Sequence, residues 1–189
     1  MRYDEINVVM LCINHHLNMK KIIFFLLCIA TGNVQAQSST YLSEMITKWG
    51  HAKKYTLEVA NAMPDSAYGF SPANGEMTFG NQLSHLGENM IWLSSKYLKN
   101  EKPPFDKIAH QGVAKIAVVE NVTRAFDYAL AALQSLKPEN LEETVDFFAG
   151  KMTKRQIVNL MNDHLTHHNS QCLVYLRLKG IKPPDYVGW

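Results

Sequence analysis

Four long stretches of this chain carry apolar residues at the three- and four-residue spacing of an α-helix, and this pattern constrains the fold most. They run from about 40 to 63, 78 to 100, 115 to 136 and 154 to 179. Such spacing places the apolar side chains on one face of each helix. No strand pattern of comparable length competes, and residues 143–148 suit one short extended piece at most. Four amphipathic helices in one small chain predict an all-α four-helix bundle.

Residues that stop or cap helices mark the ends of these stretches. Pro64 and Pro138 follow the first and third stretches, and proline lacks the backbone N–H that a continuing helix requires. Thr153 with Gln156 three residues later forms a capping box at the start of the fourth stretch. Gly180 suits the left-handed backbone position that often follows the last helical turn. We therefore expect four separate helices with defined ends.

The connections between the helices are long. They cover residues 64–77, 101–114 and 137–152, whereas helix–helix connections in bundles usually have about 2–8 residues. A long connection can cross from one end of a bundle to the other. A simple up-down-up-down order is therefore not required by the sequence.

The start of the chain resembles a secretory signal peptide over residues 19–36. Lys20 and Lys21 precede an apolar run at 22–30, and small residues occupy the positions before a cleavage point after Ala36. The apolar run is shorter than the roughly 20 residues of a membrane-spanning helix. We therefore expect an exported protein, periplasmic or secreted, with no stable membrane insertion after cleavage.

Residues 1–18, ahead of this signal, match no targeting pattern. We interpret them as an extension from a misplaced start codon, with Met19 as the true start, although the sequence alone leaves the choice between Met1 and Met19 open. The mature chain, 37–189, is long enough for one domain with its own core.

The charge of the chain limits its possible partners, and its cysteine content limits how the fold can be stabilised. The whole chain has a net charge of +2 and no basic run, which argues against a nucleic acid partner. Cys172 is the one cysteine in residues 37–189. A domain with one cysteine has no internal disulfide and depends on packing.

Three histidines form the candidate site. His164 and His168 are four residues apart, so they lie one turn apart on the same face of the fourth helix. His85 lies on the second helix. Two stacked imidazoles and a third from another helix can supply three nitrogen ligands to one metal ion and leave a coordination position open. An open position suits chemistry or ligand exchange.

A second interpretation needs no metal. Core-facing histidines are often satisfied by hydrogen bonds, and here Asn89, Gln82 or Tyr175 could pair with His164 and His168 inside the bundle. The helical spacing supports both interpretations equally. Three other histidines and the cysteine are expected to have ordinary roles: His51, His110, His167 and Cys172.

The chain resembles the DinB-like (DinB/YfiT) family in three segments. These are the proline-containing loop 63–72, the segment 76–86 that ends beside His85, and the element 163–171, with its His-x-x-x-His-x-x-Gln pattern. The resemblance implies a four-helix bundle with up-down-down-up topology. It also implies a divalent metal ion held by His85, His164 and His168.

Two departures from the family pattern limit what the resemblance implies. Asn169 and Ser170 follow the last histidine where relatives often have arginine and glycine, so no role for that arginine is carried over. Some relatives are transferases that use low-molecular-weight thiols of the cytosol. An exported chain fits that activity less well.

Three functional classes follow. The first is a metal-dependent hydrolase or thiol-type transferase with an unknown small-molecule substrate. The second is a non-catalytic bundle that binds a metal or a small ligand. The third is a purely structural bundle.

Zinc is the expected ion, with nickel or iron as alternatives, because three neutral nitrogens discriminate weakly among them. Asn89, Gln171 and Tyr175 are expected to line the pocket. A homodimer is left open.

Overall fold

The structure is a computed structural model that describes residues 37, 40–104 and 114–187. The chain divides into two compact units, Met1–Thr40 and Tyr41–Trp189, and all that follows concerns the second. The predicted extension at 1–18, the predicted signal peptide at 19–36 and His110 lie outside the described residues.

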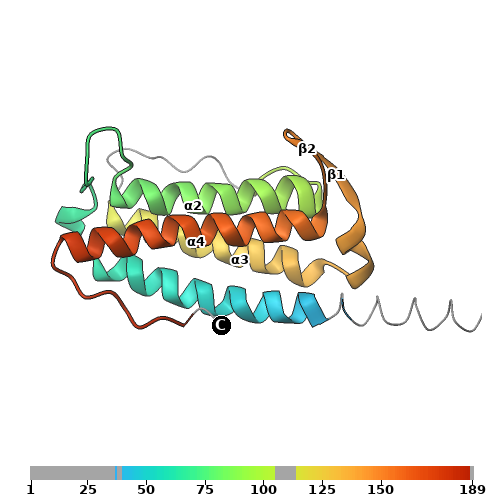
Figure 1. The fold of residues 1–189 in the computed structure, drawn as a ribbon, viewed down its shortest axis with the longest axis horizontal. Helices are drawn as coiled ribbons and strands as arrows, with labels where there is room; N and C mark the ends of the chain where they lie inside the picture. The colour runs from blue at the N-terminus through green and yellow to red at the C-terminus, as the bar shows by residue number, and fades with distance from the viewer. Residues whose placement is uncertain (1–36, 38–39, 105–113, 188–189) are drawn as a thin grey trace, which may run out of the picture. The chain divides into compact units, whose positions relative to one another are not determined.

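The four predicted helices are confirmed. The first covers residues 40–62, and it is followed by α2 (Phe79–Leu93), α3 (Lys115–Ser135) and α4 (Lys154–Leu178). Short 3₁₀ turns, η1 (Asp65–Ala67) and η3 (Pro138–Glu142), lie in the connections. Within this unit the first helix and α4 run in one direction while α2 and α3 run in the other (Figure 1). The up-down-down-up bundle is therefore confirmed.

The second helix ends differently from the regular helix predicted to residue 100. From Ser94 to Lys99 it continues as a π-helical segment, η2. The Ser94 hydroxyl donates to the Met90 carbonyl at 2.5 Å, and such a bond competes with the regular backbone ladder. Asn100, with φ of 54°, ends the segment in the left-handed conformation. Helical periodicity did not distinguish this wider turn from an α-helix.

A β-hairpin lies in the connection before α4, where only one short extended piece was expected. Strand β1 (Thr144–Phe147) pairs antiparallel with β2 (Gly150–Thr153). The Phe147 ring lies 5.9 Å from the Trp92 ring and 5.3 Å from the Tyr97 ring, between centroids. These aromatic contacts hold the hairpin against the end of the second helix.

The hairpin leads directly into α4, and the predicted capping box forms there. The Thr153 hydroxyl accepts from the Gln156 backbone N–H at 3.2 Å, and the Gln156 side chain accepts from the Thr153 backbone N–H at 2.8 Å. Two free amides at the helix start are thereby satisfied. At the other end Gly180 has φ of 72°, as predicted for the position after the last turn.

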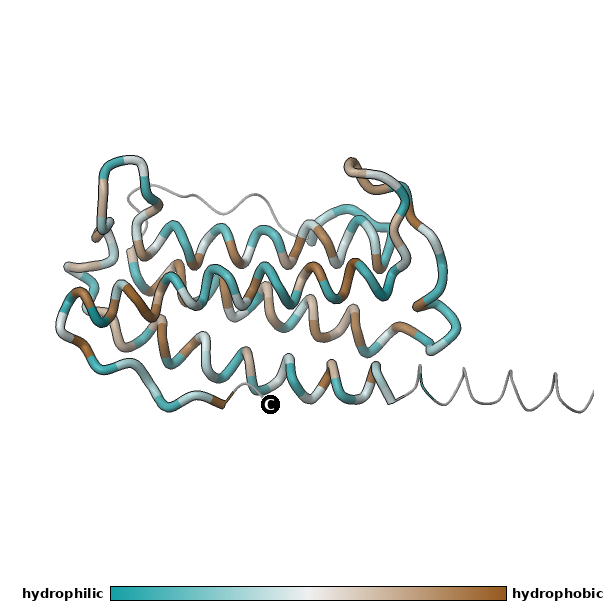
Figure 2. The backbone as a smooth tube through the Cα atoms, viewed as in Figure 1, coloured by the Kyte–Doolittle hydropathy of each residue, from teal (hydrophilic) through white to brown (hydrophobic). Residues whose placement is uncertain are grey.

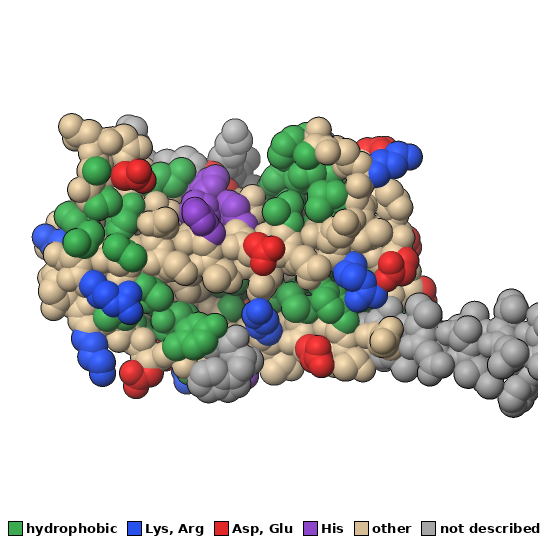
Figure 3. All heavy atoms as spheres, in the orientation of Figure 1, with side chains coloured by type: hydrophobic (Ala, Val, Ile, Leu, Met, Phe, Trp, Pro, Cys, Tyr) green, Lys and Arg blue, Asp and Glu red, His purple; other side chains and the backbone are tan. Residues whose placement is uncertain are grey.

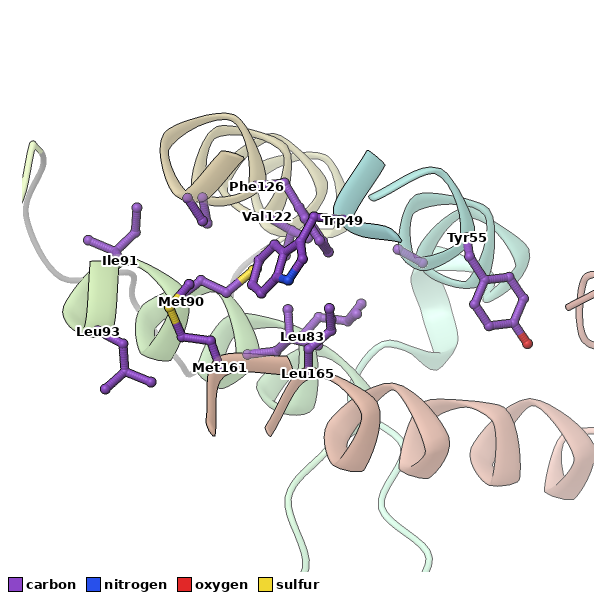
Figure 4. Packing of buried hydrophobic residues seen from close by; sticks show 14 of the residues in the cluster. Trp49, Tyr55, Leu83, Met90, Ile91, Leu93, Val122, Phe126, Met161 and Leu165 are labelled. Atoms are coloured by element: carbon purple, nitrogen blue, oxygen red, sulfur yellow. The ribbon is translucent and has the colours of Figure 1, made fainter. Parts of the chain in front are cut away.

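Apolar side chains from all four helices form one core (Figure 4). Figure 2 shows hydrophobic positions, in brown, recurring along the helices. Trp49 and Phe126 meet edge to face at 5.9 Å near its centre, and both are about 1% exposed. Two large apolar residues of these helices lie outside the core: Ile116 of α3 is 70% exposed and Leu178 of α4 is 58% exposed. Both lie in terminal turns of their helices. Along the described part of the chain, no helix combines the length and the apolar character that crossing a membrane requires.

Candidate metal centre

The bundle brings the three predicted ligands together. His85 comes from α2, and His164 and His168 come from α4, which packs against it. The Nε2 atoms of His164 and His85 are 3.2 Å apart. One nitrogen from each of the three rings lies within 4.8 Å of the others. Among the described residues, this group has the composition and spacing of a metal site.

The spacing of the nitrogen atoms fits a transition-metal ion. Zinc–nitrogen bonds of about 2.0–2.1 Å at tetrahedral angles place two ligand nitrogens about 3.3 Å apart. The observed 3.2 Å between His164 Nε2 and His85 Nε2 is close to this value. The ring centroid of His168 lies 4.7 Å from that of His85 and 4.3 Å from that of His164, so the third imidazole is next to both.

The electrostatic environment keeps the His164 and His168 imidazoles uncharged. The pKa of His164 is lowered to about 4, mainly by burial and then by the neighbouring imidazoles of His168 and His85. The pKa of His168 is also lowered to about 4, again mainly by burial and then by His85 and His167. A neutral imidazole has the free lone pair that a metal ligand requires. His164 and His168 are therefore in the metal-binding form at neutral pH.

One side of the site reaches the protein surface. His168 is 8% exposed, while His85 and His164 are half-buried. Figure 3 shows histidine side chains at the surface, between two groups of hydrophobic side chains. A small molecule can therefore reach an ion at this position without unfolding of the bundle.

The three predicted pocket residues have different surroundings. Tyr175 is buried, and its hydroxyl lies in a hydrogen-bond chain with the Gln82 amide and the Met77 carbonyl. Gln171 and Asn89 are half-buried. The Asn89 Oδ1 atom has no hydrogen-bond partner within the described residues. A role for these three in ligand binding stays a prediction.

Among the described residues, those expected to have ordinary roles lie outside the ligand group. His167 is exposed, and His51 is half-buried on the first helix. His167 contacts His168 with ring centroids 4.9 Å apart, but it is not one of the three converging residues. Cys172 is fully buried, and burial raises the pKa of its thiol well above the ordinary value. Its environment is that of a small core residue rather than a nucleophile.

Gln82 was not predicted as a site residue, yet it contacts a candidate ligand directly. Its Oε1 atom lies 2.5 Å from His168 Nδ1. The sequence placed Gln82 one turn before His85 and named it as an alternative partner for the core histidines. The three-residue spacing between Gln82 and His85 was the feature of the sequence that could have identified Gln82 as a site residue. The His168 ring has a second nitrogen, Nε2, so this hydrogen bond leaves one ring nitrogen for a metal ion.

The metal-free protein is expected to lose stability as the pH falls from about 6.5 to about 4. In this range the unfolded imidazoles bind protons, whereas His164 and His168 in the folded protein do not, since their pKa is about 4. The unfolded state then binds more protons, so folding weakens as the pH falls. Thermal melting of chelator-treated protein between pH 7.5 and pH 4.5 measures the effect.

The matched controls for this experiment are two variants. His167→Gln keeps both buried imidazoles and should keep the pH dependence, whereas a His164→Gln/His168→Gln double variant should flatten it. A melting temperature of the parent protein that is independent of pH over this range would contradict the assignment.

Comparison with known proteins finds a family model and solved structures that resemble this chain. The family model described as the DinB superfamily matches residues 49–172. The uncharacterized protein YjoA of Bacillus subtilis (strain 168) is 21% identical over 141 residues, covering 73% of this chain and 90% of YjoA. The crystal structure of that DinB-like protein has a TM-score of 0.65 at 20% identity, covering 77% of this chain and 99% of its own.

Two further solved structures share the fold. A DinB-like protein from Bacillus cereus ATCC 10987 has a TM-score of 0.62 at 17% identity, covering 76% of this chain and 95% of its own. A conserved protein from Enterococcus faecalis has a TM-score of 0.55 at 13% identity, covering 72% and 95%. At these identities the structural likeness establishes the fold alone, while the family model includes all three candidate ligands.

Proposed function

This chain belongs to the DinB superfamily, and we propose that it is an exported metalloprotein in which His85, His164 and His168 bind one divalent ion. The observation that supports this most is the convergence of three imidazoles from two helices, with two Nε2 atoms 3.2 Å apart. Zinc is the first candidate, followed by nickel and iron, because the ligand set discriminates weakly among them.

We propose hydrolysis or thiol-type transfer of a small molecule as the reaction. A bound divalent ion with an open position lowers the pKa of water or of a thiol and so supplies a nucleophile at neutral pH. The protein's own contribution is to hold the three imidazoles in place, with His164 and His168 uncharged. The half-buried surfaces of His85 and His164 leave access from one side.

A non-catalytic metal- or small-ligand-binding bundle is the second candidate. It is supported by the position of Asp163, the carboxylate next to His164 in sequence. Asp163 is exposed and lines a groove between α4 and the first helix, together with Lys48 and Tyr55. It is therefore not placed as a general base for a nucleophile at the three histidines.

Metal analysis and activity screening together test the proposal. Protein purified from its native compartment should contain about one divalent ion per chain, since overexpression in another compartment can load a different ion. Metal-loaded protein is then screened against ester, amide and phosphoester substrates and for thiol transfer. Turnover that requires the metal supports an enzyme, and metal without turnover supports the binding module. Absence of metal from the native protein would contradict the proposed metal site.

Export is a separate prediction and rests on residues 19–36. Lys20 and Lys21, the apolar run and the small residue Ala36 should direct secretion and cleavage after Ala36. N-terminal sequencing of protein from the native cell should read from Gln37, and the protein should fractionate outside the cytoplasm. A cytoplasmic chain that begins at Met1 would contradict the predicted export.

The absence of a basic run supports a small molecule rather than nucleic acid as the partner.

A further inference from the structure

A chain of three hydrogen bonds connects His168 to the backbone of the loop before α2. His168 Nδ1 lies 2.5 Å from Gln82 Oε1, Gln82 Nε2 lies 3.2 Å from the Tyr175 hydroxyl, and that hydroxyl lies 3.0 Å from the Met77 carbonyl. His168, Gln82 and Tyr175 are 8%, 4% and 1% exposed. The chain is thus almost fully shielded from water.

The Met77 carbonyl sets the direction of every bond in this chain. A carbonyl oxygen can only accept, so the Tyr175 hydroxyl must donate to it. The Tyr175 oxygen then accepts from the Gln82 amide NH₂, which turns the Gln82 carbonyl oxygen toward His168. An amide oxygen also only accepts. His168 must therefore carry its proton on Nδ1, and its free lone pair is on Nε2.

We propose that Gln82 and Tyr175 are positioning residues that hold His168 in the tautomer whose Nε2 binds the ion. This inference rests on the metal site proposed above and adds the residues that prepare it. A metal-bound histidine commonly donates its second N–H to an outer acceptor, which fixes the ring and makes the ligand more basic. Here that acceptor is an amide oxygen, itself oriented by a tyrosine and a backbone carbonyl.

Helical spacing explains why these two side chains reach the site. Gln82 precedes His85 by one turn on α2, and Tyr175 follows His168 by two turns on α4. Each is therefore on the same face as a candidate ligand. The Tyr175 ring packs edge to face against Phe70, which lies in the loop before α2, with ring centroids 5.9 Å apart. The loop, α2 and α4 are thus connected through one buried polar chain.

The tautomer can be measured directly in the metal-free full chain. Long-range ¹H–¹⁵N correlation spectra of ¹⁵N-histidine-labelled protein should show the His168 proton on Nδ1. In Tyr175→Phe the Gln82 amide loses its orienting hydroxyl, and the signal should shift toward a mixture of tautomers. A parent protein with the His168 proton on Nε2 would overturn the inference.

Zinc affinity, measured by competition with a chromophoric chelator, tests the consequence for metal binding. Gln82→Leu should lower the affinity about 10- to 100-fold, the usual effect of losing an outer partner. Gln82→Glu should restore it, because a carboxylate also accepts from Nδ1–H. A purely structural role for Gln82 predicts no such rescue. Ser84→Ala is the matched control, since Ser84 is buried on the same helix and its hydroxyl has no partner among the described residues.

The two proposals can fail separately. If the parent protein binds zinc and Gln82→Leu binds it equally tightly, the positioning role is wrong and the metal site stands. If the parent protein binds no divalent ion, the metal site fails and the positioning role fails with it. Tyr175→Phe keeps the aromatic ring and carries the test if circular dichroism shows that Gln82→Leu does not fold.

Discussion

Replacing His85, His164 or His168 by alanine is expected to abolish stoichiometric metal binding. Each change removes one of three converging nitrogen ligands. The affinity should fall by more than the roughly 10- to 100-fold that loss of an outer partner causes. The measurement is metal content per chain, by elemental analysis after loading with zinc and gel filtration, with each variant checked for its helical content.

His167→Ala is the matched control for this series. His167 lies on the same helix between the two candidate ligands, and its ring centroid is 4.9 Å from that of His168, but it is exposed and outside the ligand group. It should keep full metal content. Retention of metal in both His164→Ala and His168→Ala would leave the histidines as hydrogen-bonded core residues, which is the interpretation without a metal.

Phe126→Ala is expected to destabilise the fold by about 3–5 kcal/mol. Phe126 lies on α3 at the centre of the bundle, is 1% exposed and meets Trp49 edge to face. Its removal leaves a cavity that the neighbouring helices fill only in part, so both burial and contact energy are lost. Urea denaturation followed by circular dichroism gives the change in free energy of unfolding.

The control for this prediction lies on the same helix. Ile116 is 70% exposed, so Ile116→Ala should change the free energy of unfolding by less than about 0.5 kcal/mol. Equal effects of the two substitutions would mean that the core does not have the arrangement described. Phe126→Ala should also leave metal binding intact under conditions where the variant is folded, because Phe126 is not among the candidate ligands.

Local patterns in the sequence predicted the helices and their ends. Periodicity and stop residues are short-range properties, and the physics that forms a helix cap acts over three or four residues. The Thr153–Gln156 capping box and the Gly180 left-handed turn therefore follow from neighbouring residues alone. The pairing of His164 with His168 on one face is predictable for the same reason, since it depends only on the helical repeat.

The tertiary structure decided which helices meet and at what distance. The 3.2 Å between His85 and His164 joins residues 79 positions apart, and no local pattern encodes that distance. The β-hairpin depends on aromatic contacts with Trp92 and Tyr97, far away in sequence. The proton position on His168 depends on a chain through Gln82 and Tyr175 that exists only when α2 and α4 pack together. The sequence by itself determined the helices and the residue types on their faces. The packing of the helices determined the site, because a metal site requires long-range geometry that a single helix does not contain.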